Sequence, residues 1–353
     1  MKGLSLSLCA LSVVASSAAM AWNNTEYSHT NGLVERIQVY GESLENNVVG
    51  DYASREVFVY LPPSYYENDE KNYPVVYVLH GLGGTAQGFF ANGENDPNLD
   101  KVMDDLIASG DINEMILVVP DTYNYTLGSW YQNSAVTGNW QEYLLDDLIP
   151  TIDERFRTID DAQGRGILGH SMGGYGAIST VLAEPEEFSA VAAMSPSFLV
   201  NDFSPSLCGY FYSLQMDTLQ NWNGNPSELS YDTYVTFSLM QLSSPDLNNP
   251  PSYVKKELGL QDLNACAALD LPSQISAQQP SVKDFGHIAV RTEIGNQEML
   301  TPATYQVSEL LKGLGMQTSF NEFEGGHLDK LSVTIYDNIK FMSANLAASE
   351  LDD

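Results

Sequence analysis

The sequence feature that most constrains the fold is a serine flanked by glycines, placed between a short apolar run and a helix-like segment. It reads Gly169-His170-Ser171-Met172-Gly173 and fits the pattern Gly-x-Ser-x-Gly, in which the serine occupies a strained strand-to-helix turn. Glycines two residues before and after the serine are needed because a β-carbon would collide with the neighbouring strand or the helix start. An incidental serine in a Gly-rich turn also fits five residues, but the apolar residues 166–168 and the helical period over 175–183 supply the right context. The motif therefore predicts a nucleophile elbow.

The first residues of the chain predict a secretory signal peptide. Met1-Lys2 is a short positive start, residues 4–14 are mostly apolar, and Ala19-Met20-Ala21 is a small-x-small cleavage site. The apolar run is too short to span a bilayer. We expect a signal peptide over residues 1–21, cleavage after Ala21, a secreted or periplasmic location and no membrane insertion.

The composition is strongly acidic. The formal net charge is −31, from 15 Lys and Arg against 46 Asp and Glu. Such a surface repels nucleic acid and anionic membranes, so we expect no nucleic-acid partner and no large polyanionic substrate. The acidic residues are scattered rather than gathered in one tail, which favours a solvated surface over a cation-binding one. Nothing in the composition indicates an oligomeric state.

Two cysteines, Cys208 and Cys266, follow the predicted signal peptide. In an oxidising compartment they can pair. A bridge would close a loop of 58 residue steps and contribute about 4 kcal/mol on the chain-entropy view. The alternative is two thiols too far apart to bridge, and the sequence leaves both open.

Strands and helices alternate along most of the chain. Alternating or continuous apolar runs predict strands, and a period of 3.6 residues predicts helices. The predicted strands are 33–44, 55–61, 73–79, 115–119, 166–168, 188–196, 287–294 and 318–323, and the predicted helices are 99–107, 140–156 with a bend at Pro150, 175–183, 302–314 and 331–346. This order predicts an α/β fold of the α/β-hydrolase type, with one mostly parallel sheet of about eight strands and helices on both faces.

The alternation fails between Ser197 and Asp284, where Pro, Asn, Ser and Tyr are frequent. A passive connection is not this long, so we expect an irregular cap or lid rather than a second core. Pockets in such sheets lie beyond the carboxyl ends of the strands. We therefore expect one catalytic domain over residues 22–353, with a cap insertion at about 197–284.

A serine hydroxyl needs a base to become a nucleophile, so a histidine must accompany Ser171. Of the five histidines, His327 follows two glycines just after the last predicted strand, where the chain order of such hydrolases requires the base. The expected carboxylate is Glu298, in the loop after strand 287–294, where it would fix the tautomer of the imidazole. Glu293, within that strand, and Asp202, after the preceding strand, are the alternatives.

Two backbone N–H groups are expected to bind the oxyanion. One is that of Met172, at the start of the predicted helix, where the helix dipole favours negative charge. The other is most simply that of Leu82, in the loop His80-Gly81-Leu82-Gly83-Gly84. A phosphate-binding loop is the competing interpretation, but neither Gly-Lys-Ser/Thr nor Gly-x-Gly-x-x-Gly is present. No His/Cys cluster has ligand spacing, so we expect no metal and no organic cofactor.

Together these motifs resemble the esterase D family of α/β-hydrolases. The matching segments are 169–177, 185–190, the helix end 148–150, the glycine loop 80–84 and Gly326-His327. The family includes S-formylglutathione hydrolases, feruloyl and acetylxylan esterases, enterochelin-type esterases and mycolyltransferases. The resemblance implies Ser171 as nucleophile, His327 as base, and the amides of Leu82 and Met172 as oxyanion hole. It departs at the acid, because most relatives carry aspartate where Glu298 stands, and it is weakest across the predicted cap.

The resemblance implies a secreted serine carboxylesterase that works through an acyl-enzyme. Aromatic faces suit sugar rings or phenolic acyl groups, so feruloyl or acetyl esters of polysaccharides are the favoured substrates, with small-molecule esters also open. The aromatic residues in question are Tyr210, Phe211, Tyr212, Trp222, Tyr231, Tyr234 and Phe237 in the cap, and Tyr123, Tyr125, Trp130 and Tyr131 before it. Packing within the cap is the other interpretation of these residues. Export argues against a cytosolic formylglutathione substrate.

Two other functions stay open at this point. An acyltransferase would use the same three residues but pass the acyl group to a sugar or another alcohol. A non-catalytic binding protein on the same scaffold would be expected to have lost one of them, and none is missing from the sequence.

Overall fold

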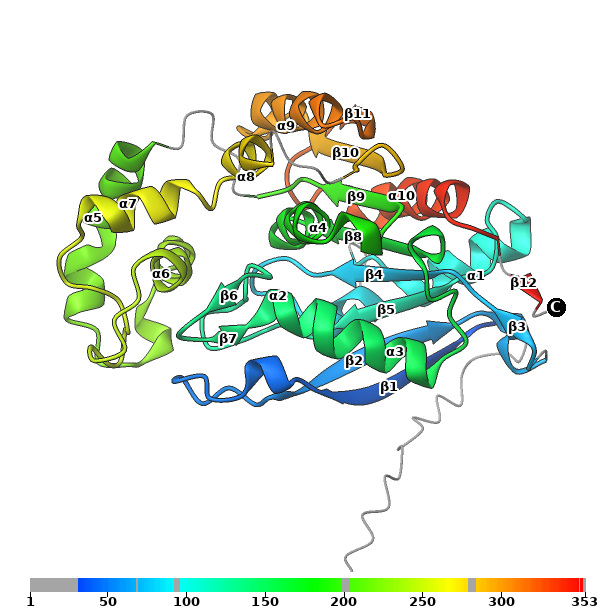
Figure 1. Cartoon of the computed structure of the whole chain (residues 1–353), viewed down its shortest axis with the longest axis horizontal. Coiled ribbons are helices and arrows are strands. Elements are labelled where there is room, and N and C mark those ends of the chain that lie inside the picture. The colour runs from blue at the N-terminus through cyan, green and yellow to red at the C-terminus, as the bar shows by residue number, and fades with distance from the viewer. Residues whose placement is uncertain are drawn as a thin grey trace, which may run out of the picture.

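The computed structural model describes residues 31–67, 69–91, 96–197, 204–278, 284–348 and 350–351. Within them, eight strands form one sheet in the order β1-β2-β5-β4-β8-β9-β10-β11 (Figure 1). These strands are β1 (Leu33–Tyr40), β2 (Ser54–Leu61), β4 (Val75–Leu79), β5 (Ile116–Pro120), β8 (Arg165–His170), β9 (Ala190–Met194), β10 (Ala289–Gly295) and β11 (Gln317–Phe323). The predicted signal peptide, residues 1–21, and the alternative acid Asp202 lie outside the described residues.

The sheet is mostly parallel, as predicted. β2 runs antiparallel to both of its neighbours, β1 and β5. All the following pairs, from β5 across to β11, are parallel. The loops that leave the parallel strands therefore meet at one edge of the sheet, where a site can be assembled from several of them.

Helices cover both faces of the sheet (Figure 1). On one face lie α1 (Leu99–Ser109) and α10 (Leu331–Asn345), and on the other lie α2 (Trp140–Glu142), α3 (Ile149–Arg155), α4 (Met172–Ala183) and α9 (Thr301–Gly313). Residues 75, 77 and 79 of β4 pack into the second layer and residues 76 and 78 into the first. Because successive residues of a strand point to opposite faces, a strand covered on both sides must be apolar throughout.

Several smaller elements complete the fold. The segment predicted as one bent helix over 140–156 consists of α2, a π-helical stretch over Tyr143–Leu148 and α3, with Pro150 at the start of α3. The N–H of Ile149 donates to the carbonyl oxygen of Leu144, five residues back, so the π-helical stretch leads directly into the turn that holds the proline. The short strands β3 (Lys71–Asn72) and β12 (Glu350–Leu351) pair with each other, as do β6 (Asn133–Ser134) and β7 (Gly138–Asn139).

The cap, which we define as the described residues 204–278, is helical rather than irregular, so that part of the prediction is wrong. It contains α5 (Pro205–Gln220), α6 (Tyr231–Ser243), α7 (Leu260–Ala267) and α8 (Leu271–Ala277). The residues that indicated a loop are helix starts, because Ser204 accepts the N–H of Leu207, Pro205 opens α5, and Ser230 accepts the N–H of Thr233. Among the described residues, no helix has both the length and the apolar character needed to cross a bilayer.

Aromatic side chains form the core of the cap. The ring of Tyr125, from the loop after β5, lies 5.8 Å from that of Trp222 and 6.5 Å from that of Phe237, and the last two lie 5.2 Å apart. Trp222 and Phe237 are buried, and so are Tyr212 and Tyr234. Four of the seven cap aromatics considered as substrate contacts are therefore buried within the cap, as the alternative interpretation has it.

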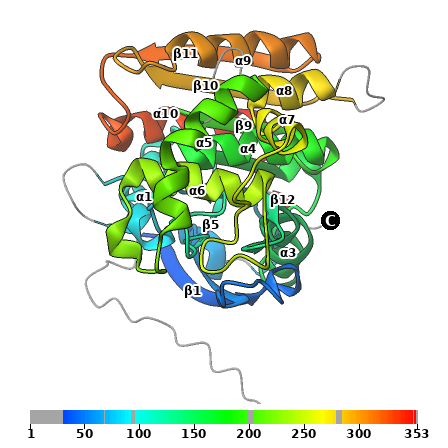
Figure 2. The same cartoon turned by 90° about the vertical axis from the view of Figure 1, so that its left-hand side faces the viewer.

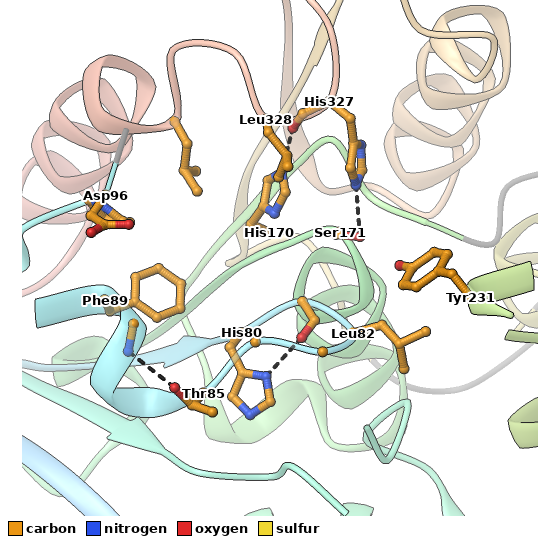
Figure 3. Close-up of a pocket in the computed structure, with 16 residues that line it drawn as sticks. His80, Leu82, Thr85, Phe89, Asp96, His170, Ser171, Tyr231, His327 and Leu328 are labelled. Carbon is orange, nitrogen blue, oxygen red and sulfur yellow. Dashed lines mark hydrogen bonds between the residues drawn. The ribbon is translucent and has the colours of Figure 1, made fainter. Parts of the chain in front are cut away.

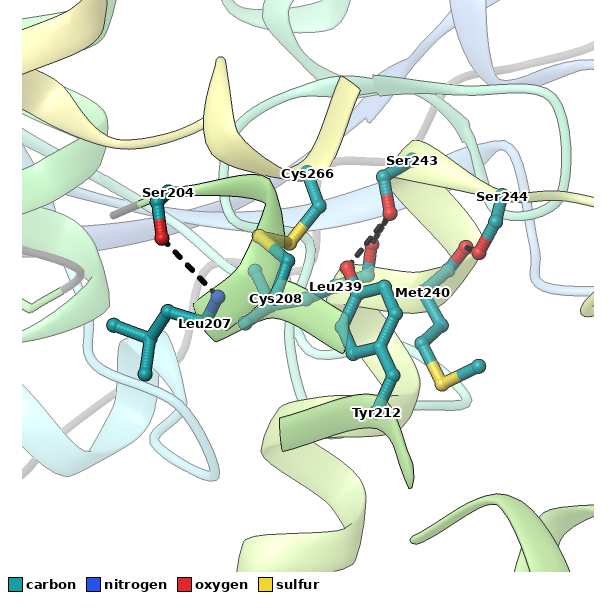
Figure 4. The surroundings of a disulfide bond; sticks show 9 residues. All are labelled: Ser204, Leu207, Cys208, Tyr212, Leu239, Met240, Ser243, Ser244 and Cys266. Carbon is teal, nitrogen blue, oxygen red and sulfur yellow. Dashed lines mark hydrogen bonds between the residues drawn. A yellow bond between two sulfur atoms is a disulfide. The ribbon is translucent and has the colours of Figure 1, made fainter. Parts of the chain in front are cut away.

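A disulfide ties the cap together. Cys208 of α5 and Cys266 of α7 are bonded, with their Cα atoms 6.2 Å apart. Beside them, the hydroxyl groups of Tyr212 of α5 and Ser243 of α6 form a hydrogen bond of 2.7 Å (Figure 4). α5 is thus joined covalently to α7 and by a buried hydrogen bond to α6, and Figure 2 shows α5 and α6 together at the end of the molecule.

Candidate active site

Ser171 lies at a tight turn between β8 and α4, with φ of 59° and ψ of −120°. A β-carbon on Gly173 would lie 2.0 Å from the carbonyl oxygen of Leu79, and one on Gly169 would lie 2.3 Å from the backbone of Gly173. Both glycines are therefore required by contact with neighbouring backbone. A left-handed serine is strained, and the turn places its hydroxyl at the carboxyl edge of the sheet.

The structure joins Ser171, His327 and Glu298 in a hydrogen-bonded series. Ser171 Oγ lies 2.9 Å from His327 Nε2 (Figure 3). At the other nitrogen of the ring, His327 Nδ1 lies 2.7 Å from Glu298 Oε2. The three residues follow β8, β11 and β10, respectively. A neutral imidazole satisfies both contacts when Nδ1–H donates to the carboxylate and Nε2 accepts the serine proton, which is the arrangement that a general base requires.

The carboxylate of Glu298 is nearly enclosed. Its side chain is 8% exposed, and its second oxygen, Oε1, accepts the hydroxyl of Ser195 at 2.6 Å and the N–H of Gly295 at 3.0 Å. Burial raises the pKa of Glu298, but the hydrogen bonds from His327, Ser195 and Gly295 outweigh it and hold that pKa below its ordinary value. The alternative acid, Glu293, binds Asn338 at 2.7 Å and does not contact His327 among the hydrogen bonds of the described residues.

Two further contacts lie next to the series, and sequence reasoning missed both. Ser171 Oγ lies 2.9 Å from Ser197 Oγ, so Ser197 is the donor when Ser171 donates to His327. The ring of His170 donates from Nε2 to the carbonyl oxygen of His327 at 2.8 Å. Burial, with the charge of nearby His327, lowers the pKa of His170 to about 4, so this ring stays neutral. The one sequence signal for Ser197 is its place directly after the predicted strand 188–196.

The glycine loop after β4 is fixed by His80. The ring Nδ1 donates to the carbonyl oxygen of Gly81 at 2.9 Å, and Nε2 accepts the N–H of Thr122 at 2.9 Å. Gly81 O also accepts the N–H of Gly84 at 3.0 Å. Because the carbonyl and N–H of one trans peptide point in opposite directions, the N–H of Leu82 points away from these donors.

Two backbone N–H groups are thereby left free near Ser171. That of Leu82 has no acceptor among the loop hydrogen bonds of the described residues. That of Met172 is the first of α4 and has none within the helix. A β-carbon on Gly81 would lie 3.2 Å from Cβ of Ser171, so the loop passes close to the serine. The two predicted donors thus sit on segments adjoining the hydroxyl.

A cavity of about 620 Å³ opens above Ser171. Its walls come from the glycine loop, from Phe89 and Asp96 before α1, from Tyr231 at the start of α6, and from Leu328 and Leu331 beside His327. Figure 3 shows the rings of Phe89 and Tyr231 on opposite sides of this space. The cavity is large enough for a small organic group and is lined mainly by apolar side chains.

Fold and site together define an α/β-hydrolase with a serine at its elbow. The family model described as "Putative esterase" matches residues 53–263, which is more than half of the chain. The chain therefore belongs to this esterase family, and the predicted resemblance to esterase D proteins is confirmed.

Individual relatives agree with this assignment. The chain is 34% identical over 153 residues to an esterase of Mycobacterium tuberculosis, a match that covers 40% of the chain and 30% of the relative. It is 35% identical over 135 residues to an endo-1,4-beta-xylanase/feruloyl esterase of Xylanibacter ruminicola, with coverage of 37% and 18%. These matches thus span less than a third of either relative.

The solved structures show the same fold over a longer range. A ferulic acid esterase superposes with a TM-score of 0.62 at 22% identity, covering 90% of this chain and 99% of that one. An S-formylglutathione hydrolase from Agrobacterium tumefaciens gives a TM-score of 0.58 at 19% identity, with coverage of 91% and 98%. The α/β-hydrolase fold is therefore shared with these enzymes.

Proposed function

We propose that this protein is a serine carboxylesterase that works through an acyl-enzyme. The observation that carries the proposal is the unbroken series of hydrogen bonds from Ser171 through His327 to Glu298 at the floor of the cavity. A nucleophile, a base and a carboxylate that orients the base are the parts that acyl transfer needs.

In the first half of the reaction, Ser171 Oγ attacks the ester carbonyl while His327 Nε2 takes its proton. The oxyanion that forms is bound by the N–H groups of Leu82 and Met172, each worth on the order of 10²–10³ in rate. Glu298 stabilises the imidazolium through Nδ1–H. When the intermediate collapses, His327 gives the proton to the departing alcohol, and the acyl group stays on Ser171.

In the second half, water replaces the alcohol. His327 removes a proton from water, the hydroxide attacks the acyl carbon, and the acid leaves as Ser171 regains its proton. Each proton taken by His327 is returned within the same half-reaction, so no metal, oxidant or cofactor enters the balance. An added sugar or alcohol that took the place of water would make the same enzyme an acyltransferase.

We propose an ester with a phenolic or other flat acyl group as substrate, with feruloyl esters of polysaccharides as the leading example. Support comes from the two rings that face the cavity, Phe89 and Tyr231, and from the feruloyl esterases among the similar proteins. Aromatic walls favour flat rings through stacking or edge contacts. An acetyl ester of a polysaccharide is the smaller alternative, and a secreted or periplasmic enzyme would meet either.

The test is hydrolysis of a panel by the mature protein and by Ser171→Ala in parallel. The panel contains p-nitrophenyl acetate, butyrate and octanoate, methyl ferulate and acetylated xylan. We expect release that depends on Ser171, with methyl ferulate preferred. If the folded protein hydrolyses none of these esters, the proposal is contradicted. If it transfers the acyl group to an added alcohol in preference to water, the protein is an acyltransferase instead.

A further inference from the structure

Ser195, the first residue after β9, is held in a backbone conformation that favours glycine. Its φ is 41°, which costs a residue with a β-carbon about 1 kcal/mol or more. Its N–H donates to the carbonyl oxygen of Glu293 at 2.7 Å, and the residue is only 2% exposed. Glycine at this position would remove the strain. The serine side chain must therefore contribute something that offsets it.

The contribution is a hydrogen bond to the carboxylate that faces His327. Ser195 Oγ donates to Glu298 Oε1 at 2.6 Å, and Gly295 N–H donates to the same oxygen at 3.0 Å. The terminal torsion of a glutamate is broad and only weakly restricted by itself. With Oε1 held by two fixed donors, Oε2 is left pointing at His327 Nδ1, 2.7 Å away.

We propose that Ser195 is a positioning residue that holds the Glu298 carboxylate in the orientation that His327 requires, an inference that rests on the proposed function. The titratable groups that face this carboxylate are His327, after β11, and His170, at the end of β8. Glu293 of β10 binds Arg291 and Asn338 instead. Ser195 acts on the reaction only through Glu298, because its hydroxyl donates to that carboxylate and forms no hydrogen bond with Ser171 among the described residues.

Two variants separate the hydroxyl from the backbone. Ser195→Ala removes the hydroxyl and keeps the strain, whereas Ser195→Gly removes both. Each leaves Glu298 with one donor fewer, so the pKa of Glu298 rises in both variants. We expect kcat to fall about tenfold in both variants, with KM unchanged. Because only the glycine variant relieves the strain, its melting temperature should exceed that of the alanine variant.

The control for relief of strain is Asn46→Gly. Asn46 also has a positive φ, of 61°, but lies exposed in a turn far along the chain from the site. We expect no change in the pKa of Glu298 in this variant. In the Glu298→Gln background, Ser195→Ala should cost no further activity, since the group through which it acts has been altered.

The deciding measurement is the titration of the Glu298 carboxyl carbon by NMR, assigned by comparison with Glu298→Gln. We expect the same upward shift of its pKa in both Ser195 variants. An unshifted titration, or losses of activity that follow the melting temperature instead of the hydroxyl, overturns the inference. This readout does not need turnover, so an inactive wild-type protein would refute the proposed function while the titration still decided the role of Ser195.

Discussion

The sheet with its flanking helices, which we call the frame, and the cap hold their residues in place by different means. In the frame, every residue of β4, β5 and β8 is buried between two layers. In the cap, aromatic contacts and the Cys208–Cys266 disulfide replace that layered core. Ser171, His327 and Glu298 each lie in a loop that follows a strand of the frame. Among the described residues that line the cavity, Tyr231 is the one that belongs to the cap. If the proposed function is right, the frame carries the reaction chemistry and most of the cavity wall, and the cap adds one ring to that wall.

The largest expected effect lies in the frame, at Glu298. Glu298→Gln keeps the size of the side chain but offers His327 an amide, which favours the wrong tautomer. We expect kcat to fall by about 10³–10⁴ for every ester in the panel, with little change in KM or melting temperature. Steady-state kinetics with p-nitrophenyl acetate measures it.

The matched control is Glu324→Gln, which removes the same charge from an exposed position in the loop after β11. It should leave kcat within a factor of two, a difference of about 0.4 kcal/mol. Equal losses in the two variants would mean that net charge, rather than the contact with His327, governs the rate.

The next effect belongs to the cap. Cys208→Ala with Cys266→Ala opens the 58-residue loop and should cost about 4 kcal/mol of local stability. Hydrogen exchange should then quicken in α5, α6 and α7 but not in β4 or β8, and hydrolysis of p-nitrophenyl acetate should persist. Parallel loss of protection in the central strands would show that frame and cap unfold as one unit.

A third effect returns to the frame and depends on pH. His170 has a pKa of about 4 when folded and about 6.5 when unfolded, so the unfolded chain binds more protons between these values. Stability is therefore lost as pH falls from about 6.5 to about 4, by up to about 3 kcal/mol. Urea unfolding at a series of pH values measures this slope.

His170→Gln is the comparison for that slope, because its side-chain amide can still donate to the carbonyl of His327 but does not titrate. The variant should show a flatter dependence over the same range. An identical slope in both proteins would assign the acid sensitivity to other groups, the cap included.

The smallest effect tests whether the cap helps to select the substrate. Tyr231→Ala removes a ring from one wall of the cavity and should raise KM for methyl ferulate about tenfold, while KM for p-nitrophenyl acetate changes little. Tyr210→Ala, an exposed tyrosine of α5 that does not line the cavity, is the control. Equal changes for both esters would place Tyr231 in the packing of the cap.

The same division explains what the sequence could predict. Strands buried on both faces must be apolar at each position, so the strands predicted at 73–79 and 115–119 could be recognised without any relative. The elbow needs glycine at 169 and 173 because neighbouring backbone passes there. Such requirements leave marks in the sequence, and all the predicted strands of the sheet are present with shifted ends.

Other features leave no such mark. α6 is buried around much of its circumference, and α5 exposes Tyr210, Phe211 and Leu214 on the side away from its buried residues. Neither helix therefore shows the one-sided apolar stripe that predicts a helix, and their serine and proline starts resemble turns. Ser195 and Ser197 belong to no motif, because their contacts arise only when the ends of β8, β9 and β10 come together. The catalytic roles assigned to Ser171, His327 and Glu298 stay predictions.

The most direct test of the central claim is the mass of the protein quenched in acid during turnover of p-nitrophenyl butyrate. A serine esterase of the proposed kind carries the butyryl group, and peptide mapping places it on Ser171. Ser171→Ala should gain no such mass under the same conditions. Turnover with no adduct under rapid quenching, or an adduct on another residue, would contradict the acyl-enzyme on Ser171.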